Sequence, residues 1–153
     1  MTRAPQQPRV FAPEFQGPVI LDSSGVIALL NRSDDAHAAC VSAASTEDEL
    51  IVPPLVLVEV DYWCRKAGAA AAFTGFVADI ALGAYQLARL EMGDVVRAVE
   101  IADTYANLDL GIVDASVIAL AERLRVVQVL TLDRRDFSVV RPRHCPALTL
   151  LPS

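Results

Sequence analysis

Short apolar runs alternate with segments of helical periodicity along this chain, and two of the runs end directly on an aspartate. Residues 19–21 lead into Asp22, and residues 126–132 lead into Asp133. Short runs that are rich in β-branched residues are typical of buried strands. Further strands are predicted at residues 50–52, 85–90 and 146–151.

Helical patterns fill the intervals between these strands, at residues 26–31, 36–44, 55–67, 69–82, 94–108 and 113–124. In the helix at 94–108, the spacing predicts that Val95, Val96 and Val99 share the buried face. Strands that alternate with helices need crossover connections, which give a mostly parallel sheet covered on both faces. The chain is therefore predicted to have an α/β fold, with its ligand site beyond the carboxyl ends of the strands.

The first 18 residues hold four prolines and three glutamines, with no helical or strand periodicity and no apolar core of a secretory signal. We interpret residues 1–18 as a flexible extension and residues 19–153 as one domain, and we expect a cytoplasmic protein. Three widely spaced cysteines indicate packing residues rather than a disulfide framework or a zinc site. The apolar segment 67–88 carries a central aspartate and much alanine, which favours a buried or half-buried helix over a membrane span.

The net charge of −6 argues against a protein that holds nucleic acid through a broad basic surface. The charge is unevenly distributed, however, because residues 119–153 contain six arginines and three acidic residues. This end of the chain is either a solvated arginine-rich face or a local binding surface for an anion.

Four acidic residues stand in otherwise apolar segments. Asp22 and Asp133 follow strands and are predicted to share one rim of the sheet, although a single aspartate at such a position more often forms a turn or caps a helix. Glu59 lies within Leu55-Val-Leu-Val-Glu-Val60, where it is either a carboxylate in need of a partner or part of a helix face turned to water. Asp114 lies in the first turn of a predicted helix, where the helix dipole favours an acid.

Taken together, the four acids indicate a metal site if they converge on one pocket. Carboxylates that lie close together repel one another unless a cation neutralises them. Oxygen ligands without histidine or cysteine favour Mg²⁺ or Mn²⁺ over zinc.

The ordered set of motifs resembles the PIN domains, and most closely the VapC-type toxins of bacterial toxin-antitoxin pairs. The motifs that carry the resemblance are the strand with Asp22-Ser-Ser, Pro54-x4-Glu59, Gly111-Ile-Val-Asp114-Ala-Ser116 and Leu130-Thr-Leu-Asp133-Arg-Arg-Asp-Phe137. The resemblance covers about residues 19–151. It implies an α/β/α sandwich and a Mg²⁺- or Mn²⁺-dependent endoribonuclease that cleaves RNA. It also implies a homodimer that is restrained by a small cognate antitoxin lying over the catalytic groove.

The same resemblance assigns roles to individual residues. The catalytic and metal-binding quartet would be Asp22, Glu59, Asp114 and Asp133. Ser24 and Thr131 would assist through water or metal, and Asp136 would either approach the metal or form a salt bridge with a nearby arginine in a loop. Arg134 and Arg135, which follow Asp133 directly, are the arginines best placed to hold the RNA backbone.

Other functional classes fit less well. A phosphoacceptor receiver domain needs a lysine near its acids, and the single lysine, Lys66, lies in the middle of a predicted helix. The phosphate-binding patterns G-x-x-x-x-G-K-[ST] and G-x-G-x-x-G do not occur. The remaining alternative is a catalytically silent PIN-like module that acts only by binding another protein.

Overall fold

The computed structural model describes residues 17–153, so residues 1–16 of the predicted extension lie outside the described part. The strands are β1 (Pro18–Leu21), β2 (Glu49–Val52), β3 (Gln86–Leu87), β4 (Gln128–Leu130) and β5 (Thr149–Leu151). The helices are α1 (Ser23–Leu30), α2 (His37–Ser45), α3 (Val56–Lys66), α4 (Ala70–Ala81), α5 (Met92–Thr104), α6 (Ile112–Leu124) and α7 (Arg134–Val139), with a 3-10 turn η1 at Ala106–Leu108.

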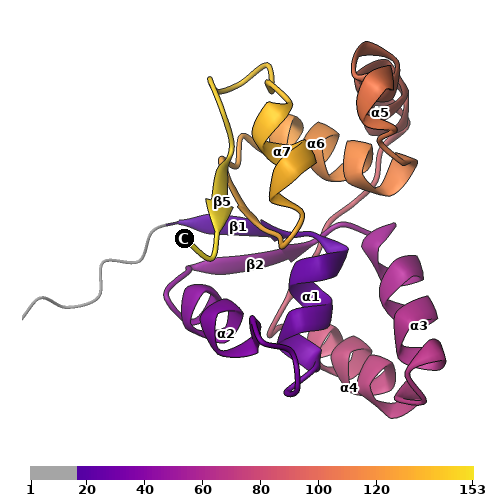
Figure 1. Ribbon diagram of the computed structural model, residues 1–153, viewed down its shortest axis with the longest axis vertical. Coiled ribbons are helices and arrows are strands. Elements are labelled where there is room, and N and C mark those ends of the chain that lie inside the picture. The colour runs from indigo at the N-terminus through magenta and orange to yellow at the C-terminus, as the bar shows by residue number, and fades with distance from the viewer. Residues whose placement is uncertain (1–16) are drawn as a thin grey trace, which may run out of the picture.

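The sheet has the order β3-β2-β1-β4-β5, and every pair of neighbouring strands is parallel. Helices α1–α4 lie on one side of it and α5–α7 on the other (Figure 1). This arrangement confirms the predicted three-layer α/β/α sandwich. Because β1 and β4 are adjacent and parallel, their carboxyl ends deliver Asp22 and Asp133 to the same rim.

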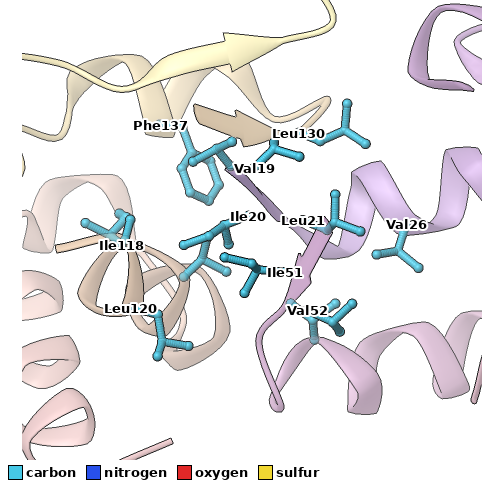
Figure 2. Close-up of a cluster of buried hydrophobic side chains, with 14 of the residues drawn as sticks. Val19, Ile20, Leu21, Val26, Ile51, Val52, Ile118, Leu120, Leu130 and Phe137 are labelled. Carbon is cyan, nitrogen blue, oxygen red and sulfur yellow. The ribbon is translucent and has the colours of Figure 1, made fainter. Parts of the chain in front are cut away.

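The core forms around β1, whose residues Val19, Ile20 and Leu21 are fully buried. Figure 2 shows them beside side chains of the neighbouring elements, among them Leu130 of β4 and Phe137 of α7. A strand that is buried on both faces has no polar alternation, and this explains the continuous apolar runs in the sequence.

The segment 67–88 forms the twelve-residue helix α4 and the short strand β3. Phe76 is buried and packs edge-on against Tyr85, with ring centroids 4.9 Å apart, while most of α4 is exposed. Within residues 17–153, no helix is both long enough and apolar enough to cross a membrane. Cys40 and Cys64 are free and buried, as expected of packing residues.

Helix α5 is rotated relative to the sequence prediction. Val96 and Val99 are half exposed, whereas Ala98 and Ile101 are buried, so the prediction that Val96 and Val99 face the core is wrong. Two ion pairs join α5 to α6 in this orientation, namely Asp94 with Arg123 at 2.8 Å and Arg97 with Glu122 at 2.7 Å. The apolar face was predicted from hydrophobicity alone, and these charged partners lie 25 or more residues away in the sequence.

The second difference from the prediction is α7, which occupies the segment after Asp133 that was expected to be a loop. Its six residues include two arginines and one aspartate, so they carry little apolar periodicity. The buried Phe137 holds the helix against the core. Short helices of this kind depend on tertiary packing, which a local pattern does not contain.

Candidate active site

Asp22 is almost completely buried, with 2% of its surface exposed, at the junction of β1 and α1. It occupies the N-cap position of α1, yet its side chain makes no capping hydrogen bond. Instead, Oδ2 accepts hydrogen bonds from Thr131 Oγ1 at 2.9 Å and from Ser24 Oγ at 3.0 Å. The simple interpretation of Asp22 as a helix cap is therefore wrong for its carboxylate, which faces the end of β4.

The second oxygen of this carboxylate, Oδ1, is buried and has no hydrogen-bond partner among the described residues. Burial raises the pKa of Asp22, while the hydrogen bonds from Thr131 and Ser24 act in the opposite direction. A buried carboxylate oxygen without a donor is costly, because it has lost its hydration shell without compensation. The site therefore contains one carboxylate oxygen, Oδ1 of Asp22, that has no hydrogen-bond donor among the described residues. The hydroxyl groups of Ser24 and Thr131 orient this carboxylate through its other oxygen.

Ser24 and Thr131 also fix the chain after β4. Ser24 Oγ accepts a hydrogen bond from the backbone amide of Leu132 at 2.9 Å, and Thr131 Oγ1 accepts one from the amide of Asp133 at 3.0 Å. Asp133 stands at the N-cap position of α7 without a capping hydrogen bond from its side chain. The two hydroxyl groups thus connect Asp22 to the backbone that carries Asp133.

Glu59 lies on the exposed surface of α3, because Val56 and Val60 take the buried face of that helix. The aliphatic neighbours in the sequence therefore do not surround the carboxylate, and the interpretation of Glu59 as an acid in apolar surroundings is wrong. The carboxylate nevertheless has a partner, since Ser23 Oγ donates a hydrogen bond of 2.5 Å to Oε1 of Glu59. The sequence analysis did not include Ser23 among the site residues.

Asp114 lies in the first turn of α6, half-buried, where the other acids act on it electrostatically. Burial raises the pKa of Asp114 from 3.8 to about 7, and the charges of Asp22, Glu59, Asp133 and Asp136 contribute to the shift. Four acids from three parts of the chain, namely the start of α1, α3 and the start of α7, thus act on the same carboxyl group. A divalent cation bound among these acids would stabilise the ionised form of Asp114.

One pocket of about 560 Å³ brings these residues together. Its polar side is lined by two serines, Ser23 and Ser24, and by the four predicted acids. These acids are Asp22, Glu59, Asp114 and Asp133. Its apolar side is formed by Ile27, Val58, Tyr62 and Trp63. The four acids that the sequence singled out therefore surround a single cavity.

The residues of α7 make other contacts. Asp136 is buried and pairs with Arg135 at 2.9 Å, so the expected salt bridge is present, although in a helix rather than a loop. Arg134 donates a hydrogen bond of 2.6 Å to the carbonyl oxygen of Pro152. Both arginines are exposed beside Asp133, and their contact with RNA stays a prediction.

The donor set suits a hard divalent cation. Among the described residues, no three side chains of the types His, Cys, Asp and Glu lie close enough together to hold a metal ion as they stand. The unpartnered Oδ1 of Asp22 and the raised pKa of Asp114, which burial and the neighbouring acids cause, are both features that a bound cation would stabilise. Carboxylate oxygens without nitrogen or sulfur ligands match Mg²⁺ or Mn²⁺.

The raised pKa of Asp114 predicts a stability change in the metal-free protein. The protonated form of Asp114 contributes to the free energy of unfolding. This contribution is fully present below the ordinary pKa of 3.8 and is lost as the pH rises through about 7. Because the group is partly solvated, we expect Asp114→Asn to raise the free energy of unfolding at pH 8 by about 1 to 2 kcal/mol, and by less at pH 5. Urea denaturation in EDTA measures both values.

The exposed Asp103 of α5 provides the control for this measurement. Asp103→Asn removes the same charge away from the pocket, and we expect a change within about 0.5 kcal/mol at either pH. Equal stability of the Asp114→Asn variant and the wild type at pH 8 would contradict the electrostatic description of the site.

Comparisons with known proteins identify the family and the fold of the chain. A model of the PIN domain family matches residues 19–141. Ribonuclease VapC26 of Mycobacterium tuberculosis is 34% identical over 137 residues, which cover 88% of this chain and 100% of that protein. A crystal structure of VapC20, a sarcin-ricin loop cleaving toxin of the same organism, matches with a TM-score of 0.69 and 18% identity, covering 76% of this chain and 91% of that one.

A toxin-antitoxin complex from Klebsiella pneumoniae also shares the fold, with a TM-score of 0.59 and 18% identity over 80% of this chain and 92% of that one. The two structural matches concern the fold, whereas the family model and VapC26 extend to the sequence. The chain belongs to the PIN domain family and, within it, to the VapC proteins.

Proposed function

We propose that this protein is a Mg²⁺- or Mn²⁺-dependent endoribonuclease that acts in the cytoplasm as the toxin of a toxin-antitoxin pair. The observation that carries the proposal is the pocket in which Asp22 presents a buried, unpartnered carboxylate oxygen beside Asp114, Asp133 and Glu59. The ribonuclease name of VapC26, 34% identical to this chain, supports the choice of RNA as substrate.

The protein's own residues define the mechanism that we propose. Asp22, Asp114 and Asp133 would hold the divalent ion, with Asp22 oriented by the hydroxyl groups of Thr131 and Ser24. When bound, the ion supplies positive charge that polarises the phosphate and acidifies water. Glu59, at the exposed side of the pocket, either accepts the proton of the attacking water or ligates a second ion. In-line attack then leaves a 5′-phosphate and a 3′-hydroxyl, as expected for this family.

The RNA substrate is proposed to be single-stranded or a loop, because a folded duplex presents its scissile phosphate poorly to a pocket. Arg134 and Arg135 are proposed to contact the backbone next to Asp133. The side chain of Arg135 is 79% exposed, which leaves most of its guanidinium accessible to phosphate despite the pair with Asp136.

Two protein partners form part of the proposal. A small antitoxin would cover the apolar side of the pocket, where Val58 and Tyr62 of α3 are 67% and 64% exposed next to the acids. The toxin-antitoxin complex from Klebsiella pneumoniae, which shares this fold, supports such a partner. A second copy of the chain would form a homodimer, for which the outward stripe of Met92, Val96 and Val99 on α5 supplies apolar surface.

Cleavage of RNA by the purified chain tests the function. We expect cleavage with Mg²⁺ or Mn²⁺, no cleavage after EDTA, and recovery when the ion is restored, with 5′-phosphate ends on the products. Calcium, which prefers more ligands and longer bonds, serves as the control ion and is expected to support cleavage poorly. If the purified chain neither binds the metal nor cleaves RNA, the catalytically silent binding module is favoured.

A further inference from the structure

Two consecutive serines at the start of α1 hold two different carboxylates. Ser24 donates its hydroxyl proton to Asp22 and accepts a hydrogen bond from the amide of Leu132, so it faces the end of β4. Ser23 faces the other way and donates to Glu59 on α3, which is 36 residues distant in the sequence. Consecutive residues of a helix point about 100° apart, so one Ser-Ser pair can reach two elements at once.

Glu59 depends on such a contact more than the other acids do. It is exposed on α3, and its long side chain has many accessible rotamers. The negative charges of Asp22 and Asp114 also tend to push its carboxylate away from the pocket. The residue Ser23 is only 7% exposed, and its hydroxyl donates a hydrogen bond to Oε1 of Glu59.

We propose that Ser23 is a positioning residue that holds the carboxylate of Glu59 at the pocket and thereby completes the binding site for the divalent ion. The role of Ser24 is separate, because its hydroxyl orients Asp22. This inference rests on the proposed function only in so far as the pocket binds Mg²⁺ or Mn²⁺, and it does not require RNA to be the substrate.

A double-mutant cycle on Mn²⁺ binding, measured by calorimetry on the full chain, tests the proposal. Loss of a hydrogen bond that orients a ligand typically lowers metal affinity 10- to 100-fold. Because Glu59 is exposed, we expect Ser23→Ala to lower the affinity for Mn²⁺ by about 10-fold. In a Glu59→Gln background we expect Ser23→Ala to have almost no further effect, since the carboxylate that it orients is absent.

Two further variants separate positioning from a general structural effect. Ser23→Thr keeps the hydroxyl and is expected to bind Mn²⁺ within about 3-fold of the wild type. Ser24→Ala is the matched control, because its target is Asp22, and it is expected to lower the affinity to the same extent with or without Glu59→Gln. Thermal unfolding of each variant without metal establishes that the fold is retained.

The possible outcomes distinguish the two proposals. If Ser23→Ala lowers the affinity for Mn²⁺ by the same factor with and without Glu59→Gln, the positioning role of Ser23 is overturned. The proposed nuclease function would remain intact. Strong coupling between the two, together with no cleavage of any RNA by the wild type, would support Ser23 and refute the nuclease. A wild-type protein that binds no Mn²⁺ would overturn both.

Discussion

Replacing Asp22 with asparagine is expected to lower metal-dependent RNA cleavage by a factor of about 100 to 1000. Asparagine has the shape of aspartate and its oxygen can accept the hydrogen bonds that Thr131 and Ser24 donate to Oδ2. It removes the charge that attracts the ion, whose contribution to the transition state amounts to several kcal/mol, and each 1.36 kcal/mol corresponds to a factor of ten in rate. Single-turnover cleavage of RNA in excess Mn²⁺ measures the loss.

The stability of the same variant separates lost chemistry from lost folding. Burial raises the pKa of Asp22, so a neutral side chain at this position relieves a cost in the metal-free protein. The variant is therefore expected to unfold at the same or a higher urea concentration than the wild type. Asp103→Asn, on the exposed surface of α5, is expected to cleave RNA at the wild-type rate. Cleavage by Asp22→Asn within a few-fold of the wild type would refute the assignment.

Gly25→Ala is expected to destabilise the protein by about 3 kcal/mol. A Cβ atom at Gly25 would lie 2.4 Å from the carbonyl oxygen of Leu130 and 2.9 Å from its carbonyl carbon. That carbonyl accepts a hydrogen bond from the amide of Asp22, and β4 is held between β1 and β5, so the backbone has little freedom to move. Overpacking of this kind typically costs 1–3 kcal/mol, and an immobile backbone places this case at the upper end. Urea denaturation measures the change.

Gly75 in the middle of α4 provides the matched control. A Cβ atom at Gly75 meets no atom within 4 Å, and glycine inside a helix is about 1 kcal/mol less favourable than alanine. Gly75→Ala is therefore expected to leave the stability unchanged or to increase it. A Gly25→Ala variant as stable as the wild type would show that α1 can retreat from β4. Asp22 would then not be held as closely to Thr131 as the structure indicates.

The strands and most of the helices were predictable because their signals are local. The run at 19–21 has the composition of a strand buried on both faces, and Gly111 and the periodic residues after it define α6. The parallel order follows from the alternation of strands with helices, and that order explains why Asp22 and Asp133 meet at one rim. The prediction of a four-acid cluster used the same local information, strengthened by the resemblance to a known family.

The features that the sequence did not predict depend on tertiary contacts. The sequence left open whether Glu59 is a carboxylate in need of a partner or part of a helix face turned to water. In the structure Val56 and Val60 face the core and Glu59 is exposed beside the pocket, which a local pattern does not show. The bond between Ser23 and Glu59 joins two helices that pack only in the folded chain. Gly25 carries no special signal in the sequence, since its role follows from the proximity of Leu130.

We propose that the carboxylates of Asp22, Glu59, Asp114 and Asp133 form one site for a divalent cation. Titration of Mn²⁺ into the metal-free wild-type protein, followed by calorimetry, tests it most directly. We expect saturable binding to the wild type and loss of that binding in both Asp22→Asn and Asp114→Asn. Wild-type protein that takes up no Mn²⁺, or variants that bind it with unchanged affinity, would contradict it.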